Sequence, residues 1–393
     1  MNMKSGTARR DSNHIRKKAD ETKMSKKISV ITLHSVQNYG SALQTYATQK
    51  FFERIGWNTD IVDYMRENNL RENLVATGLK NSRFWNRNFL TRFVYTALRK
   101  KRLEERYDIF DDFIKRNINI TPQRYYSEED LEKNPPQADV YCTGSDQTWN
   151  TFWNRGILKP FFLCYAPRGA KKISYAASFG KKSLDKDEEK EIYSHLKDYS
   201  GITVREEEGA EIVRNMGLCA ECVLDPTLML RGDEWRQLAA PRMFEKYVLI
   251  YQFTPNKIFN EAAKRLAKAK GLRLIRIGFA NDAYLYCGKP VINPTVEEFL
   301  SLIANAEYIV TDSFHATSFA INLKVDFACY MPKKFSGRIQ NILEIAGLEK
   351  RVFESADELL KIADEKIDFS DAEVRIDEMR EKSENIMKKI LND

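Results

Sequence analysis

The stretch that decides the fold is YIVTDSFHAT, residues 308–317. Its first four residues form an apolar, β-branched run typical of a buried strand, and residues 316–323 have the apolar spacing of a helix. Ser313 is placed to cap that helix, so His315 falls in its first turn, just after the strand ends. Open α/β sheets bind ligands at this position, where backbone N–H groups and the helix dipole favour an anion. The alternative interpretation is a histidine that only satisfies buried backbone groups.

Strands and helices alternate on both sides of this stretch. An apolar run at Ile28–Leu33, a helix at Ala42–Ile55 and a strand at Thr59–Tyr64 form one βαβ unit. The same alternation resumes beyond residue 230, so we predict an α/β protein with two doubly wound domains facing each other across a cleft. We place a disordered basic lead-in at residues 1–27, the first domain at 28–230 with a mostly helical insertion near 69–117, and the second at 231–393, ending in a charged helix.

Composition narrows the class of protein. The 393 residues are 43% hydrophobic, which is enough for two cores, and no apolar run reaches membrane-spanning length. The six cysteines are scattered, as expected for reduced thiols in the cytoplasm. The pair Cys219-x-x-Cys222 lacks a second pair, so we expect no metal, and no motif calls for a cofactor. The net charge of +7 is not carried on a compact recognition module, so we expect no nucleic-acid partner.

Residues 80–106 interleave basic and aromatic side chains. On a helix, Trp85, Phe89 and Phe93 would share one stripe, followed by a basic run at Arg99–Arg102. The interpretation we favour is an aromatic face packed on the first domain with a solvated basic back. The alternative is an interfacial helix that gives the protein peripheral contact with anionic lipid at the inner membrane surface.

Two of the four histidines, His34 and His315, each follow a predicted strand, one in each domain. Because such strand ends line the crevice of an open sheet, both residues are candidates for proton transfer in one cleft. Arg205 also follows a predicted strand and begins a helix, where the positive end of the helix dipole disfavours a cation. An anionic ligand explains an arginine in that place better than helix stability does.

Two loops have the composition of sugar-binding surfaces. The loop at residues 34–41 has one glycine where a dinucleotide motif needs three, and its Asn, Tyr and Ser side chains suit sugar hydroxyls. The loop GSDQTWN, residues 144–150, combines planar polar groups with an aromatic ring. An ordinary capped turn is the alternative for each loop. The candidates for binding an acceptor are His34, Asn38, Tyr39, Gly40, Ser145, Gln147 and Trp149.

Five phrases in this order resemble the polysaccharide pyruvyl transferase family: NYGSALQ (38–44), GSDQTWN (144–150), VREE (204–207), LDPTL (224–228) and TDSFH (311–315). The likeness extends from about Ile28 to Leu348. It implies two Rossmann-like domains in a glycosyltransferase-B-like pair. It also implies transfer of a pyruvyl group from phosphoenolpyruvate to a sugar of a surface polysaccharide, or to a lipid-linked oligosaccharide precursor, leaving a pyruvate ketal. By that likeness, Arg205 and His315 fall at donor positions.

The chain departs from the family at one turn. Members often carry Arg-Leu-His where this chain has Ser313-Phe314-His315, so the arginine that would grip the donor is missing. Either Lys333, Lys334 or Arg338 from the next loop takes its place, or the donor is not phosphoenolpyruvate. The predicted donor-binding residues are Arg205, Ser313, Phe314, His315 and Arg338.

The predicted chemistry needs an acid, an anion clamp and a base. His315 is the candidate acid or phosphate ligand, Arg205 the clamp, and Asp146, His34 or Asp312 the base. Two rival functions use the same cleft. One is a glycosyltransferase with a nucleotide-sugar donor, and the other is a non-catalytic glycan-binding protein.

Overall fold

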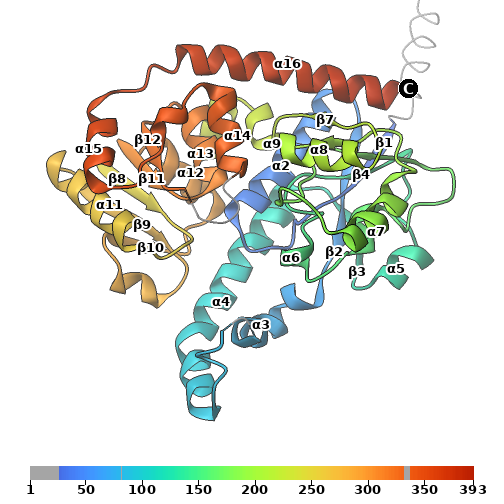
Figure 1. Ribbon diagram of the computed structural model, residues 1–393. Helices are drawn as coiled ribbons and strands as arrows, with labels where there is room; N and C mark the ends of the chain where they lie inside the picture. Colours follow the sequence, from blue (N-terminus) through green and yellow to red (C-terminus); the bar gives the residue numbers. More distant parts are fainter. Residues whose placement is uncertain (1–25, 81, 332–336) are drawn as a thin grey trace, which may run out of the picture.

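The computed structural model describes residues 26–80, 82–331 and 337–393, and the described chain forms two five-stranded parallel sheets (Figure 1). The first sheet has the order β3-β2-β1-β4-β5, with β1 (Lys27–Ile31) at its centre. A short parallel ladder extends it beyond β5 through single bridges, one of which joins Ala177 to Val204. The remaining strands of this half are β2 (Asn58–Tyr64), β3 (Ile120–Tyr125), β4 (Val140–Thr143), β5 (Lys171–Ser174), β6 (Thr203–Val204) and β7 (Glu221–Cys222).

The second sheet has the order β10-β9-β8-β11-β12, with β8 (Tyr247–Tyr251) at its centre. Its β11 (Tyr308–Thr311) confirms the strand predicted at residues 308–311. The other strands are β9 (Arg273–Gly278), β10 (Lys289–Ile292) and β12 (Phe327–Cys329). In both sheets the central strand comes first in the chain, and the later strands are added first on one side of it and then on the other. This reversal of the strand order creates a crevice at the carboxyl ends of the strands.

Helices connect successive strands and cover the sheets (Figure 1). In the first half they are α2 (Tyr39–Arg54), α3 (Leu74–Lys80), α4 (Phe89–Asn117), α5 (Glu128–Lys133), α6 (Thr151–Asn154), α7 (Lys186–Leu196), α8 (Glu207–Asn215) and α9 (Pro226–Met229). In the second they are α10 (Gly232–Leu238), α11 (Lys257–Ala269), α12 (Val296–Ala304), α13 (Phe314–Asn322), α14 (Gly337–Ala346), α15 (Ala356–Asp364) and α16 (Ser370–Asn392). Short 3-10 turns are η1 (Glu67–Asn69), η2 (Arg71–Asn73), η3 (Lys159–Phe162), η4 (Asn281–Leu285) and η5 (Glu349–Arg351).

Buried aromatic side chains join the two halves. Tyr39, in the first turn of α2, stacks on Phe299 of α12 with ring centroids 4.3 Å apart. Its hydroxyl donates a hydrogen bond to the carbonyl oxygen of Pro294 at 2.6 Å. Tyr251 and Phe279 pack around the same ring, so an apolar contact holds the two sheets in a defined relation.

The last helix, α16, runs from the second half back across the first (Figure 1). Ser383 accepts a hydrogen bond from the backbone N–H of Leu224 at 3.0 Å, and the Met387 sulfur accepts one from Thr203 at 3.7 Å. Ile390 packs so closely on Gly201 that a Cβ there would lie 2.5 Å from it. The charged helix predicted at the end of the second domain therefore also packs on the first sheet.

The described residues between Leu74 and Leu98, which we call the α3–α4 hairpin, project away from both sheets (Figure 1). The favoured prediction, an aromatic face packed on the first domain, is wrong for this part, because Phe89 and Phe93 are exposed. Trp85 lies in the turn before α4 begins and contacts Tyr95, whose ring is buried inside the hairpin. The predicted stripe is therefore divided between an inner and an outer face.

Within the described part of the chain, no helix is both long enough and apolar enough to cross a membrane. The predicted lead-in falls outside the described residues, except for its last two.

Candidate active site

A cavity of about 600 Å³ lies between the carboxyl ends of the two sheets. Loops after β1, β2 and β4 form one wall, and loops after β8 and β11, together with the start of α14, form the other. Its lining residues are Leu33, Val36, Asn38, Ser41, Arg66, Asn68, Asn69, Asp146, Gln147, Trp153, Asn154, Phe253, Thr254, Asp312, Ser313, Phe314, His315, Arg338 and Ile339. This is the position at which doubly wound sheets bind ligands.

His315 lies where the first turns of two helices meet. Ser313 caps α13, and Asn38 caps α2 by accepting from the backbone N–H of Ser41 at 3.3 Å. The imidazole of His315 rests on Gly40, where an added Cβ would lie 2.0 Å from Nδ1. Glycine is thus required here because it lets the two helix starts come together. Both helix N-termini direct free N–H groups and positive dipole ends to this point, which favours an anion.

Burial sets the protonation of His315. The side chain is nearly enclosed, and its Nε2 has no hydrogen-bond partner among the described residues. Burial lowers the pKa of His315 to about 4, although the nearby carboxylates of Asp225 and Asp146 oppose that shift. The imidazole is therefore neutral at neutral pH when the cavity holds no ligand.

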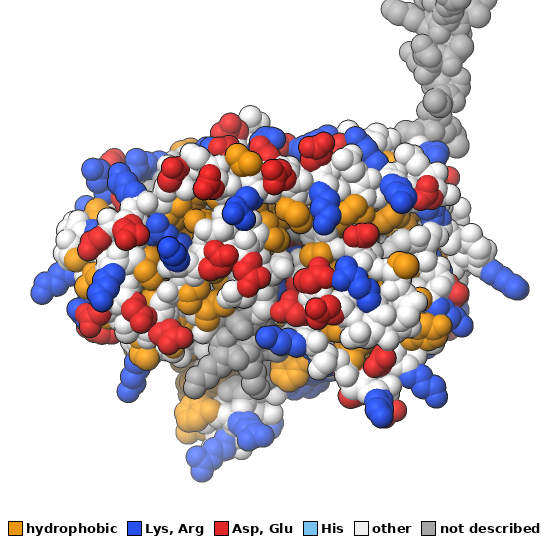
Figure 2. All heavy atoms as spheres, turned by 45° about the horizontal axis from the view of Figure 1, so that its top comes forward, with side chains coloured by type: hydrophobic (Ala, Val, Ile, Leu, Met, Phe, Trp, Pro, Cys, Tyr) orange, Lys and Arg blue, Asp and Glu red, His pale blue; other side chains and the backbone are white. Residues whose placement is uncertain are grey.

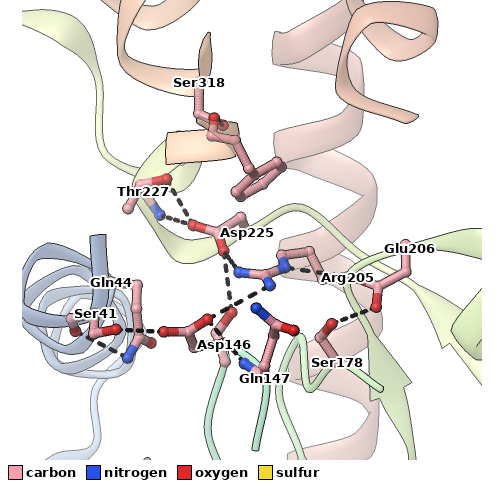
Figure 3. Close-up of polar contacts among 12 residues, drawn as sticks. Ser41, Gln44, Asp146, Gln147, Ser178, Arg205, Glu206, Asp225, Thr227 and Ser318 are labelled. Carbon is pink, nitrogen blue, oxygen red and sulfur yellow. Dashed lines mark hydrogen bonds and ion pairs between the residues drawn. The ribbon is translucent and has the colours of Figure 1, made fainter. Parts of the chain in front are cut away.

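Arg205 sits at the centre of a buried ion network (Figure 3). Its Nη1 donates to Asp225 at 2.7 Å, while its Nη2 lies 3.7 Å from an oxygen of Asp146 and its Nε 3.6 Å from one of Glu206. Burial opposes the charge of Arg205, but these carboxylates outweigh it and raise the pKa of the guanidinium. The guanidinium carbon lies 4.7 Å from the ring centre of Phe314, which lines the cavity, whereas Arg205 does not. Carboxylates of the chain itself therefore balance the positive charge of Arg205, whereas the sequence analysis predicted an anionic ligand beside it.

Asp146 joins this network to the cavity wall. It adopts a left-handed backbone with φ of 74°, a conformation that aspartate tolerates at a cost. Its Oδ2 accepts a hydrogen bond from Ser41 at 2.6 Å, and its Oδ1 accepts one from the backbone N–H of Gln147 at 2.8 Å. Burial alone would raise the pKa of Asp146, but Arg205 holds it below the usual value. Asp146 is therefore ionised at neutral pH.

Two further cations line the cavity. Arg338, at the start of α14, has its guanidinium carbon 5.7 Å from the ring centre of Phe314, and burial lowers its pKa to about 10. With its carboxamide turned to place oxygen toward Arg338, Gln147 accepts a hydrogen bond from Nη2 at 3.1 Å. Arg66 approaches from the first sheet and donates to Asn154 at 2.9 Å. Of the three cations suggested to replace the missing family arginine, Arg338 reaches the cavity, whereas Lys333 and Lys334 lie outside the described residues.

Asp312 follows β11 and also lines the cavity. Its two oxygens accept backbone N–H groups of Phe253 at 2.7 Å and Thr254 at 2.8 Å, and so hold the loop after β8. Burial raises the pKa of Asp312 despite these hydrogen bonds.

The predicted acceptor residues separate into two groups. Asn38 and Gln147 line the cavity, and Gly40 supports His315 from behind. The structure does not bring the other four to the cavity wall. His34 contacts Asp63 at 3.2 Å beside a separate small cavity, Tyr39 is buried between the halves, Ser145 donates to Asp225 at 3.1 Å, and Trp149 is stacked on Phe162 in the core.

Sequence reasoning missed Arg66, Trp153 and Phe253. Arg66 follows the predicted strand Thr59–Tyr64 by two residues, so a cation at a strand end was the available signal. Trp153 is exposed at the cavity wall, four residues beyond the buried Trp149, and the loop composition alone does not show which ring faces out. Among the described residues, no three His, Cys, Asp or Glu side chains are grouped to hold a metal ion.

Two doubly wound domains that close on one cleft define a glycosyltransferase-B-like protein. The profile of polysaccharide pyruvyl transferases matches residues 38–333, and the chain belongs to this family.

Comparison with solved structures bears on the fold alone. A crystal structure of a UDP-N-acetylglucosamine 2-epimerase aligns with a TM-score of 0.51 at 10% identity, covering 94% of this chain and 96% of that one. The UDP-GlcNAc 2-epimerase of Neisseria meningitidis, bound to UDP-GlcNAc, aligns with a TM-score of 0.48 at 10% identity, covering 93% and 99%. Among curated protein sequences, none matches this chain.

Proposed function

We propose that this chain transfers a pyruvyl group from phosphoenolpyruvate to two hydroxyls of one sugar, in a surface polysaccharide or its lipid-linked precursor, and forms a pyruvate ketal. The observation that carries the proposal is the meeting of His315, Arg66 and Arg338 around one cavity in a member of this family. A pyruvyl donor needs cations for two anionic groups and a proton for its enol carbon.

The donor binds through the cations of the two walls. Phosphoenolpyruvate carries a carboxylate and a phosphate, and Arg66 and Arg338 face the cavity from opposite domains. The converging first turns of α2 and α13 add backbone donors between them. In this proposal Arg338 does the work of the arginine that the Ser313-Phe314-His315 turn lacks.

Arg205 acts as a positioning residue. Its guanidinium contacts Asp225 at 2.7 Å and lies behind the ring of Phe314, so it orients the cavity wall and keeps Asp146 ionised. This role differs from the direct donor clamp expected for Arg205 from the sequence.

His315 supplies the proton. The donor's negative charge next to the imidazole raises its low pKa, so the donor binds together with a proton. His315 then protonates C3 of the enol, and a sugar hydroxyl forms a bond to C2. The C2–O bond to phosphate breaks, phosphate leaves with the bonding electrons, and a second hydroxyl closes the ketal.

Asp146 is the proposed base. It is ionised, it lines the cavity, and Ser41 donates to it at 2.6 Å, so it accepts the proton of the attacking hydroxyl directly or through Ser41. Asp312 is less suited, because both of its oxygens hold backbone N–H groups. The second hydroxyl proton leaves with phosphate or solvent.

The acceptor sugar lies against the exposed aromatic side chains of the cavity wall. Trp153 and Phe253 offer ring faces from the two domains, and Asn68 and Asn69 offer amide groups for hydroxyls. We place the reaction in the cytoplasm, which suits six cysteines that are all free thiols.

The test is release of inorganic phosphate from phosphoenolpyruvate with a panel of acceptor glycans, followed by mass spectrometry of the product. We expect phosphate release that depends on one acceptor class, and a product carrying a pyruvate ketal. Arg66→Gln should raise the KM for phosphoenolpyruvate, because Arg66 contacts donor and not acceptor.

Two outcomes would overturn the proposal. Sugar transfer from a nucleotide-sugar without any need for phosphoenolpyruvate would indicate a glycosyltransferase. Glycan binding without turnover of either donor, and undiminished in His315→Ala, would indicate a non-catalytic glycan-binding protein.

A further inference from the structure

The outer face of the α3–α4 hairpin exposes large apolar side chains. Phe89 is 82% exposed, Leu90 68%, Phe93 62% and Phe84 64%. Soluble surfaces expose single apolar residues routinely, but four large ones on one projecting tip mark an interaction surface. We call these four residues the apolar tip.

Basic residues surround the apolar tip, and acidic residues are missing from it. Residues 80–102 contain eight lysines and arginines and no aspartate or glutamate. Among the described residues, Lys80, Arg83, Arg87 and Arg92 have no ion-pair partner, and all four are exposed. The basic residues nearer the two sheets form ion pairs: Arg99 with Asp282 at 2.6 Å, and Arg102 with Glu105 at 2.8 Å. Unneutralised positive charge is therefore concentrated where the apolar side chains are exposed.

The hairpin is well formed without a partner on its outer face. Tyr95 is buried inside it, against Trp85 and so close to Gly78 that a Cβ there would lie 2.0 Å from the tyrosine oxygen. Asn88 and Thr91 form a reciprocal capping box at the start of α4. The exposure of Phe89 and Phe93 is thus a property of a folded element.

The shape of the hairpin limits what can bind it. It is a convex projection (Figure 1), and hydrophobic and basic side chains gather at the lower tip of the molecule in Figure 2. A convex apolar tip offers no groove to a peptide or to single-stranded nucleic acid. It does suit insertion into a lipid headgroup layer, with the bases against lipid phosphates.

We infer that the apolar tip inserts into the surface of a membrane rich in anionic lipid, and that Lys80, Arg83, Arg87 and Arg92 bind the headgroups. This inference rests on the hairpin alone and does not depend on the proposed function. Asn68 and Asn69 line the cavity and precede α3 by a few residues, so the same short segment connects the cavity rim to the membrane-binding element.

The experiment is vesicle sedimentation of the full chain, with vesicles of phosphatidylcholine alone or mixed with phosphatidylglycerol. We expect sedimentation only with the mixed vesicles, and a decrease as salt rises, because exposed charges are screened. The variant Arg83→Gln, Arg87→Gln, Arg92→Gln should bind on the order of 100-fold more weakly, since each basic residue near the surface strengthens binding about fivefold. Phe89→Ser with Phe93→Ser should also abolish most binding.

The matched control removes three charges elsewhere. Lys186→Gln, Lys190→Gln and Lys197→Gln change exposed bases at α7 and should leave vesicle binding nearly unchanged. Thermal unfolding should be unaltered in all three variants, because every replaced side chain is exposed.

Three results would overturn the inference. One is absence of sedimentation with mixed vesicles at low salt, and another is an equal loss of binding in the α7 control. The third is a dimer in analytical ultracentrifugation that Phe89→Ser with Phe93→Ser converts to monomer, since the tip would then be an interface between copies.

Discussion

At the scale of single residues, His315 and Arg66 behave differently from what their types suggest. A histidine at a helix start is readily interpreted as a charged anion ligand, but enclosure by Gly40 and Phe314 keeps this one neutral in the free protein. In the sequence Arg66 looks like an ordinary exposed arginine. In the structure it lines the cavity, because β2 ends beside β1. The charge state and the accessibility of these side chains therefore depend on which neighbouring residues bury them.

Replacing His315 tests its role as acid. His315→Ala should lower kcat roughly 10²- to 10⁴-fold in the phosphate-release assay, because a positioned proton donor typically contributes that much. His34→Gln is the matched control, since His34 also follows a strand but lies beside a different cavity. Near-normal turnover in His315→Ala would remove this residue from the mechanism.

The low pKa of His315 also predicts a pH-dependent stability. An ordinary histidine has a pKa of 6.5 and the folded protein holds this one at about 4, so between these values the unfolded chain binds more protons. Its contribution to stability is present above pH 6.5 and is lost as the pH falls toward 4. The free energy of unfolding of the wild type, relative to that of His315→Gln, should therefore fall by about 2 kcal/mol between pH 7 and about pH 4.5 in denaturant unfolding. A difference that stays constant with pH would contradict the burial of a neutral imidazole.

At the scale of elements, the strands that the sequence did not reveal share one feature. β3 contains Pro122 and β10 contains Pro290, and each strand lies at the edge of its sheet. Proline and exposed polar side chains are tolerated at edges, where one side of the strand needs no ladder, and they remove the apolar run that indicates a strand. The predicted strands at Ile28–Leu33, at the centre of the first sheet, and at residues 308–311, beside the centre of the second, contain no such interruption.

The last helix provides a test at this scale. Met387 of α16 is fully buried against the first sheet, and we expect Met387→Ala to lower the free energy of unfolding by about 2–4 kcal/mol. Val374→Ala on the same helix is the control, because Val374 is exposed and should cost less than about 0.5 kcal/mol. Chemical denaturation measures both, and equal effects would show that α16 does not fasten the two halves.

At the scale of the whole molecule, the cleft arises because two sheets bring their carboxyl ends together. The stacking of Tyr39 on Phe299 holds the two sheets in this arrangement. Helix α16 also connects the halves, because it runs from the second half across the first. Gly40 and His315, which are separated by more than a hundred positions, meet only through this packing.

The sequence by itself determined the two parallel sheets, the position of His315 at a helix start after β11, and the family, because periodicity, caps and motifs are local properties of the chain. Only the tertiary structure decided that Trp149 is core while Trp153 faces the cavity, that Arg205 is met by carboxylates of the chain, and that Arg66 and Arg338 face one space. The physical reason is that burial and charge pairing depend on contacts between distant segments. Side-chain type and spacing establish which face of an element is apolar, but the partner that covers that face, or leaves it exposed as in the α3–α4 hairpin, is set by the packing of the whole chain.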